Sequence, residues 1–270
     1  MFKKKNILGV RITNAKEDEI LEYILQGLEK VTKKYFIVTP NPEILMLAHK
    51  NLRYKKILNS AELALPDGIG VMIAGKILNK ELKKRITGVD LVESLCRAVE
   101  EKPITVGFLG AGPAVAEQTA ECLIKKFPTL KVVFTASGNP DGATVQLVRK
   151  KILSNKDIKI LSKEKTKGKN APNILISQYL DILFVAFGSP KQEIWIYENL
   201  EKLPVKVVIG VGGAFDFISG KVKRAPFWIR KAGLEWLFRL INQPWRIKRQ
   251  FRLIKFIFLV VKEKFKIKMV

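Results

Sequence analysis

The sequence predicts an α/β protein with a parallel sheet and a basic, aromatic-rich helical appendage at its C-terminal end. Short apolar runs alternate with amphipathic helical patterns over most of the chain, which is typical of a parallel sheet covered by helices. The last fifth of the chain is different, because it concentrates positive charge and tryptophan. With 270 residues, the chain is long enough to bury a large core and still carry an appendage.

The first elements are expected between residues 14 and 68. An amphipathic helix is indicated by the spacing of Ile20, Tyr23, Ile24 and Leu28. A buried strand at residues 35–38 leads into a helix that Asn41 caps and Pro42 begins. A shorter strand at residues 63–65 then leads into a turn at Asp67 and a further helix.

The middle of the chain repeats the same alternation. Four more strands are expected at residues 104–109, 131–135, 182–187 and 205–211. Helices are expected at residues 90–100, 113–127, 141–153 and 191–200. Residues 151–173 are rich in lysine and asparagine and poor in apolar residues, which predicts a solvated helix end and a loop.

Cysteine and histidine usage excludes several classes of site. Cys96 and Cys122 lie far apart, so we expect a reducing compartment and neither a disulfide framework nor a CxxC metal site. His49 is the only histidine, which leaves no material for a histidine-rich metal centre or a Ser–His–Asp triad. We see no signal peptide at the start and no apolar run of about twenty residues, so no transmembrane helix is expected.

The net charge of +24 predicts a polyanionic partner: a nucleic acid, an anionic membrane or a phosphorylated ligand. From Lys221 onward there are 15 basic and only two acidic residues, together with three of the four tryptophans. Residues 251–260 mix cations with bulky apolar groups, as helices in a membrane interface do. The alternative is a basic helix that packs on the domain while its lysines are merely solvated.

Polar and glycine residues gather where the expected strands end. In an open parallel sheet, ligands bind outside the carboxyl ends of the strands, so these loops predict a binding cleft. The loops are at residues 39–41, 67–68, 110–112, 188–193 and 210–216. Residues 107–113 suit phosphate binding, but tight strand–helix packing explains their glycines equally well. The sequence has no P-loop and no Asp-x-Asp motif, and Asp67 on its own could be a plain turn residue.

Seven blocks in the same order resemble the WecG/TagA/CpsF glycosyltransferases over essentially the whole chain. They are residues 39–43, 66–70, 85–90, 188–193, 212–216, 224–226 and 235–240. The resemblance is greatest to the TagA-type branch of wall teichoic acid synthesis. It implies a Rossmann-like catalytic domain, residues 1–214, and an appendage, residues 215–270, that associates with the membrane and binds the acceptor diphosphate.

The implied reaction is a metal-independent, inverting transfer of N-acetylmannosamine from its UDP derivative to the 4-hydroxyl of undecaprenyl-diphospho-N-acetylglucosamine. Asp67 corresponds to the expected base, and Thr39 and Asn41 to catalytic pocket residues that orient a substrate. Substrate-binding positions are expected at Arg85, Gln192, Gly212, Gly213, Asp216, Arg239, Arg246 and Arg249. Arg239, Arg246 and Arg249 would stabilise the leaving UDP in the absence of a metal, because guanidinium groups match diphosphate oxygens. No cofactor is expected.

The expected partners are a UDP-sugar, a polyprenyl-diphosphate-linked sugar and an anionic membrane, which places the protein peripherally on the cytoplasmic membrane face. Self-association stays open, and no nucleic acid is expected. One alternative is a family member that uses another UDP-sugar, such as N-acetylmannosaminuronic acid or a hexose. Two further alternatives have less support. Interpretation as a nucleic-acid-binding protein is based on charge alone, and interpretation as a NAD-dependent oxidoreductase is based only on residues 107–112. The chain departs from the family in its lysine-rich segment before Asp181 and its long tail after Arg252.

Overall fold

A computed structural model describes residues 2–29, 33–154, 180–244 and 247–268, and it confirms the α/β fold class. A six-stranded sheet has the order β4-β3-β8-β7-β5-β6. The pairs β3–β4, β5–β6, β5–β7 and β7–β8 are parallel. The strands are β3 (Tyr35–Val38), β4 (Leu63–Ala64), β5 (Thr105–Gly110), β6 (Lys131–Ala136), β7 (Leu180–Ala186) and β8 (Val205–Gly210). All six lie within two residues of the predicted positions.

The chain divides into two compact units that do not follow the sequence order. The first unit contains Met1–Ile20, Ile37–Gly88 and Val222–Val270, and the second contains Leu21–Phe36 and Val89–Lys221. The C-terminal segment therefore shares a compact unit with the residues around Asp67. The division into a catalytic domain, residues 1–214, and an appendage, residues 215–270, stays a prediction about function.

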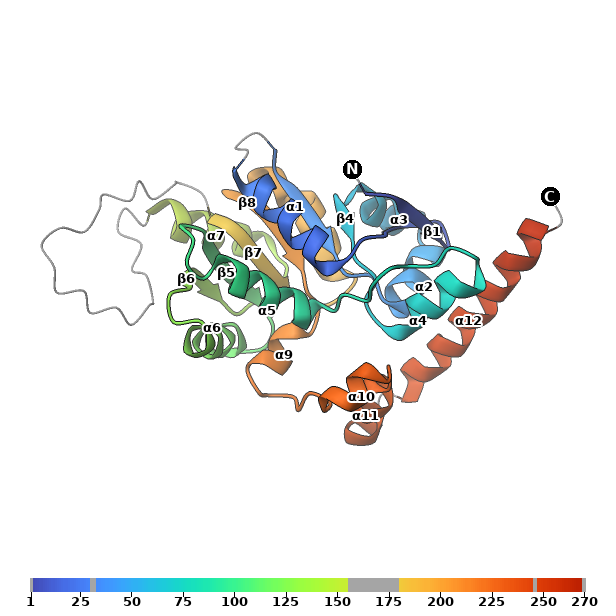
Figure 1. The fold of residues 1–270 in the computed structure, drawn as a ribbon. Helices are drawn as coiled ribbons and strands as arrows, with labels where there is room; N and C mark the ends of the chain where they lie inside the picture. Colours follow the sequence, from blue (N-terminus) through green and yellow to red (C-terminus); the bar gives the residue numbers. More distant parts are fainter. Residues whose placement is uncertain (1, 30–32, 155–179, 245–246, 269–270) are drawn as a thin grey trace, which may run out of the picture. The chain divides into compact units, whose positions relative to one another are not determined.

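The second unit is built on the four strands β5 to β8. Its helices are α5 (Gly88–Val99), α6 (Val115–Lys126), α7 (Gly142–Ser154), α8 (Lys191–Asn199) and α9 (Ala214–Ile218), with a 3-10 turn, η1 (Leu200–Lys202), and most of α1 (Glu17–Glu29) (Figure 1). Its core contains three fully buried aromatic rings. Phe108 stacks on Phe184 with ring centroids 5.5 Å apart, and it meets Phe215 edge-on at 5.6 Å. These rings join β5, β7 and α9 through apolar contact.

The first unit begins with an antiparallel hairpin that the sequence did not predict, formed by β1 (Lys4–Ile7) and β2 (Val10–Thr13). Its helices are α2 (Pro42–Lys50), α3 (Leu52–Ser60), α4 (Ile69–Ile77), α10 (Phe227–Lys231), α11 (Glu235–Asn242) and α12 (Ile247–Lys268). In Figure 1, α12 runs alongside α2 and α4, and it contacts both helices.

Helix α12 has two apolar faces with different surroundings. Phe256 and Val260 are completely buried, whereas Phe251, Ile254 and Phe258 are each more than half exposed. One face therefore packs within the first unit, and the other presents large apolar side chains to solvent. No helix within the described part of the chain has the length and apolarity needed to cross a membrane. Helix α7 ends at Ser154, and the rest of the predicted solvated segment, residues 155–173, lies outside the described residues.

Candidate active site

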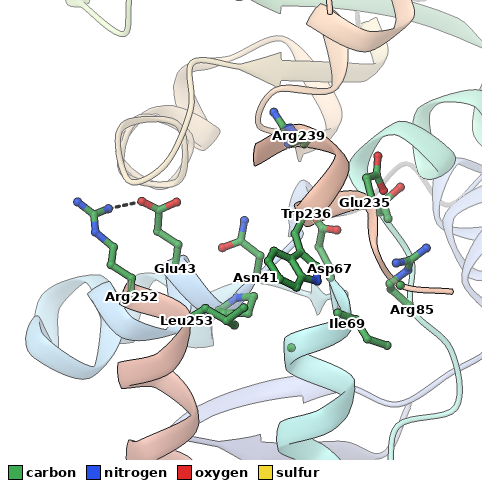
Figure 2. Close-up of a pocket in the computed structure, with 15 residues that line it drawn as sticks. Asn41, Glu43, Asp67, Ile69, Arg85, Glu235, Trp236, Arg239, Arg252 and Leu253 are labelled. Carbon is green, nitrogen blue, oxygen red and sulfur yellow. Dashed lines mark hydrogen bonds and ion pairs between the residues drawn. The ribbon is translucent and has the colours of Figure 1, made fainter. Parts of the chain in front are cut away.

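A pocket of about 220 Å³ lies entirely within the first unit, beside Asp67. Five separate stretches of the chain contribute to its wall. The lining residues are Asn41, Pro42, Glu43, Asp67, Gly68, Ile69, Gly70, Arg85, Thr87, Gly233, Glu235, Trp236, Arg239, Arg252 and Leu253. Figure 2 shows the ion pair of Glu43 and Arg252 on one side of the pocket, and Arg85 and Glu235 on the other side. The structure thus brings together Asn41, Asp67, Arg85 and Arg239, four of the residues singled out from the sequence.

Asp67 is held by backbone hydrogen bonds between loops. Its amide N–H donates to the Pro40 carbonyl at 2.9 Å, and the Pro66 carbonyl accepts from the amide of Ile86 at 3.0 Å. Gly68, with φ +85, then turns the chain into α4. The three loops are therefore fastened to one another through the backbone, which fixes the Cα of Asp67 while its half-buried side chain lines the pocket.

Asn41, beside Asp67 in the pocket wall, also has a structural role in helix α2. Its side-chain oxygen accepts the amide N–H of Ile44 at 3.0 Å and so caps α2, as the sequence predicts. The side-chain oxygen of Asn41 is thus used by the cap, and its side-chain nitrogen is the hydrogen-bond donor that Asn41 brings to the pocket wall. Thr39 is only 4% exposed and is not among the lining residues, so it is buried near Asn41 without lining the pocket.

Three arginines line the pocket, and each comes from a different element. Arg85 donates from its Nη2 to the Arg230 carbonyl at 3.1 Å, which ties the loop after α4 to α10. Arg239 belongs to α11, and Arg252 belongs to α12, where it forms an ion pair with Glu43 of α2. Of the other two predicted arginines, Arg249 lies in α12 and Arg246 lies outside the described residues.

Trp236, Glu235 and Arg252 are pocket residues to which sequence reasoning gave no role. The first two belong to the block at residues 235–240 that carried part of the family resemblance, so a signal for them was present. Arg252 follows Arg246 and Arg249 at a spacing of three, which on a helix continues one face. The contact between residues near 252 and residues near 43 joins distant parts of the chain, and no local pattern predicts it.

The other predicted substrate-binding residues lie in the second unit, after strands β7 and β8. Gly212, Gly213 and Asp216 form the turn into α9, with Gly212 at φ +58. Gln192 of α8 is buried, and its side-chain oxygen accepts the amide N–H of Gly212 at 3.0 Å. Its side-chain nitrogen donates to Glu193 at 2.7 Å. The amide of Gln192 therefore braces the glycine turn, and its expected role in substrate binding stays a prediction.

Close packing explains two of the glycines in residues 107–113. A Cβ on Gly107 would lie 2.8 Å from a Leu180 side-chain carbon, and one on Gly110 would lie 2.8 Å from the Phe187 ring. Strand packing thus requires both residues to be glycine. Among the described residues, no group of three or more His, Cys, Asp or Glu side chains is arranged to hold a metal ion.

A parallel sheet with a polar pocket after β3 and β4 defines an α/β enzyme with a binding site at the carboxyl ends of its strands. Comparison with protein families sharpens this class. The chain belongs to the glycosyl transferase WecG/TagA/CpsF family, whose model matches residues 5–269. It is a glycosyltransferase, and the interpretations as an oxidoreductase or a nucleic-acid-binding protein give way to this finding.

Two similar proteins carry the same name. The N-acetylglucosaminyldiphosphoundecaprenol N-acetyl-beta-D-mannosaminyltransferase of Bacillus spizizenii strain W23 is 36% identical over 230 residues, which is 85% of this chain and 80% of that protein. The protein of the same name from Staphylococcus aureus strain MRSA252 is 30% identical over 266 residues, 98% of this chain and 95% of that one. The similarity to the Staphylococcus protein thus extends over nearly the full length of both chains.

Proposed function

We propose that this glycosyltransferase transfers N-acetylmannosamine from UDP-N-acetylmannosamine to the 4-hydroxyl of undecaprenyl-diphospho-N-acetylglucosamine, with inversion and without a metal ion. The names of its relatives in Bacillus and Staphylococcus support the acceptor and the transferred sugar. The observation that carries the proposal is the pocket itself, in which the carboxylate of Asp67 shares about 220 Å³ with Arg85, Arg239 and Arg252.

One displacement accounts for the chemistry. Asp67 accepts the proton of the acceptor hydroxyl, and the oxygen attacks the anomeric carbon of the donor sugar. The bond from that carbon to the UDP oxygen breaks on the opposite face, and UDP leaves with the bonding electrons. A single base is sufficient for this reaction, because no covalent sugar–enzyme intermediate forms.

The arginines have the second role, which is to stabilise diphosphate charge. Guanidinium forks match pairs of phosphate oxygens, and fixed cations favour negative charge in a partly enclosed site. Arg239 and Arg85 line the pocket, and we assign Arg239, Arg246 and Arg249 to the diphosphate of the leaving UDP. Asn41 presents its side-chain amide to a substrate hydroxyl, and Thr39 supports that loop from behind.

We assign the uridine of the donor to the second unit. Gly212 and Gly213 leave the backbone after β8 open to close approach by a ligand, and Asp216 lies in the first turn of α9. A carboxylate there suits the hydroxyls of a ribose or the N–H of a uracil. Gln192 holds this turn in place through Gly212.

The lipid-linked acceptor calls for a membrane, and the first unit offers a surface that suits one. Seven large apolar side chains of α10, α11 and α12 are more than half exposed: Phe227, Trp228, Ile241, Phe251, Ile254, Phe258 and Phe265. Lysines and arginines are interspersed among them, so anionic headgroups would add to the apolar contact. We therefore propose peripheral attachment to the cytoplasmic membrane face through residues 215–270.

A different donor sugar within the family remains the second candidate. A uronic acid donor would require an additional cation to neutralise its carboxylate. Arg252 is an additional cation at the pocket, but it is already paired with Glu43. This pairing favours a neutral sugar, such as N-acetylmannosamine, over a uronic acid.

The test is release of UDP from UDP-N-acetylmannosamine by the purified full-length chain, with EDTA and a short-chain lipid-diphospho-N-acetylglucosamine. Release that depends on the acceptor and persists in EDTA is expected. Release only from another UDP-sugar would move the function within the family, and release that EDTA abolishes would overturn metal independence. A product with retained anomeric configuration would contradict the single displacement.

A further inference from the structure

Trp236 occupies an unusual place for a large aromatic residue. It is 38% exposed, and among the described residues that line the pocket it is the only aromatic one. No ring or cation stacks on its indole in the described part of the structure. Figure 2 shows the indole extending from α11 into the pocket, near Asn41 and Asp67. An aromatic face left open inside a polar pocket is available to a ligand.

The backbone around Trp236 is fixed relative to Asp67. Gly233, with φ +75, approaches α4 so closely that a Cβ there would lie 3.0 Å from a side-chain carbon of Ile69, two residues after Asp67. At the start of α11, Glu235 pairs with Arg224 at 3.9 Å. The hydrogen bond from Arg85 to the Arg230 carbonyl holds the preceding helix. The backbone that carries the indole therefore has a defined position relative to Asp67.

The pocket offers two kinds of surface. Its polar wall carries Asp67, Asn41 and the arginines, whereas the faces of Trp236, Pro42 and Leu253 are apolar. A pyranose ring also has two kinds of surface: a rim of hydroxyls and faces that carry C–H groups. An aromatic ring presents electron density to those C–H groups, while the hydroxyls reach hydrogen-bonding partners at the rim.

We propose that Trp236 is the platform for the acceptor sugar, with its indole packed against the C–H face of the N-acetylhexosamine ring that Asp67 deprotonates. The proposal rests on the proposed function, since it takes Asp67 as the base. The platform fixes the tilt of the ring and thereby which hydroxyl points at the carboxylate. Trp236 is thus a residue that determines specificity for the acceptor, and the donor does not depend on it.

Four substitutions at Trp236 and one matched control test this role. Trp236→Leu removes the aromatic face but keeps an apolar side chain, and it should raise the acceptor KM about tenfold, as expected for the loss of one stacking contact. Trp236→Phe and Trp236→Tyr should retain most of the affinity, and Trp236→Ala should lose the most. The donor KM should stay within about twofold of the wild type in every variant.

Leu237→Ala is the control, because Leu237 follows on the same helix and is 37% exposed but does not line the pocket. Its acceptor KM should be unchanged. An acceptor KM that is unaltered in Trp236→Leu, or that rises equally in Leu237→Ala, overturns the proposal. A thermal melt of each variant identifies any that is unfolded, and the aromatic variants then carry the test.

A binding measurement separates this proposal from the proposed function. Without donor, the short-chain lipid-diphospho-N-acetylglucosamine should shift the tryptophan fluorescence of the wild type but not the corresponding signal in Trp236→Phe. A shift in the wild type without turnover of UDP-N-acetylmannosamine would support Trp236 and sink the proposed donor. Normal turnover with the same shift in both proteins would sink the role of Trp236 alone.

Discussion

The loops that follow the strands in the two compact units differ in the sequence distance to the residues that complete them. In the second unit, the turn after β8 is braced by Gln192, which lies only twenty residues before Gly212. In the first unit, the pocket beside Asp67 gains Trp236, Arg239 and Arg252 from a segment more than 160 residues away in sequence. A ligand site can therefore be assembled locally, or completed only when a distant segment packs against it.

The largest expected effect is on turnover, and it should distinguish Asp67 in the first unit from Asp216 in the second. Asp67→Asn should reduce turnover by about a hundredfold to ten-thousandfold, because the amide cannot accept the acceptor proton. Asp216→Asn should instead raise the donor KM and leave turnover at saturating donor within a few-fold, since we assign Asp216 to binding. Steady-state kinetics with each substrate varied in turn distinguishes the two. Equal losses of turnover in both variants would remove the distinction between base and binding residue.

The next largest effect is on the stability of the first unit, and it measures how strongly α12 packs there. Phe256 is completely buried on α12, whereas Phe258, two residues later, is 67% exposed. Phe256→Ala should destabilise the first unit by about 3–5 kcal/mol, because it leaves a cavity against the helices beneath α12. Hydrogen exchange of the amides in α2 and α4 reports this loss, since α12 contacts both helices.

Phe258→Ala is the matched control on the same helix. It should change stability by less than about 0.5 kcal/mol, because the side chain is already in solvent. Its effect should appear in sedimentation with anionic vesicles, where a lost apolar contact weakens binding. If Phe258→Ala destabilised the first unit as much as Phe256→Ala, the distinction between a packing face and a membrane face would be wrong.

A smaller loss of stability is expected in the second unit, where Gln192 braces the turn at Gly212. Gln192→Leu keeps the approximate size of the side chain but removes the acceptor for the Gly212 N–H, at a cost of about 1–3 kcal/mol to the second unit. The donor KM should rise as the turn loosens, while the acceptor KM stays unchanged. Lys191→Ala, at the exposed neighbouring position, is the control and should behave as the wild type. A stable Gln192→Leu variant with a normal donor KM would show that the turn needs no brace.

The sequence predicts what depends on local patterns. Apolar runs placed all six strands of the main sheet, and the Asn41–Pro42 pair predicted the start of α2 together with its cap. The hairpin β1–β2 was missed, because two strands of four residues joined at Leu8 and Gly9 are too short for a clear alternation. The turn itself depends on positive φ angles, 50° at Leu8 and 84° at Gly9, and a leucine does not signal such a turn.

In the candidate site, too, local sequence patterns predicted some residues and could not predict contacts between distant segments. Asp67, Asn41, Arg85 and Arg239 were found because they lie in short sequence blocks whose common order resembles one family, and the structure gathers them in one pocket. Arg252 and its partner Glu43 were not connected, because their contact exists only once α12 has packed on α2. The buried hydrogen bonds of Gln192 were equally invisible in the sequence, and they show that its side chain also braces the neighbouring turn.

The smallest predicted effect is a pH dependence confined to the start of α7. The hydroxyl of Thr144 donates to the carboxylate of Asp141 at 2.8 Å, and this bond, with the Thr144 amide, holds the pKa of Asp141 below its usual range. The folded state therefore binds this proton more weakly than the unfolded state. The resulting stabilisation is complete above the ordinary aspartate pKa of about 4 and disappears as the pH falls through the lower, folded value.

Hydrogen exchange at the Thr144 amide measures this contribution, after correction for the intrinsic rate at each pH. Protection should be lower at about pH 3 than at neutral pH in the wild type, because protonation weakens the cap. Asp141→Asn keeps an acceptor oxygen but has no proton to bind, so its protection should change little between the two conditions. Equal pH sensitivity in both proteins would assign the effect to another group. The cap would then act through its hydrogen bond alone, independent of charge.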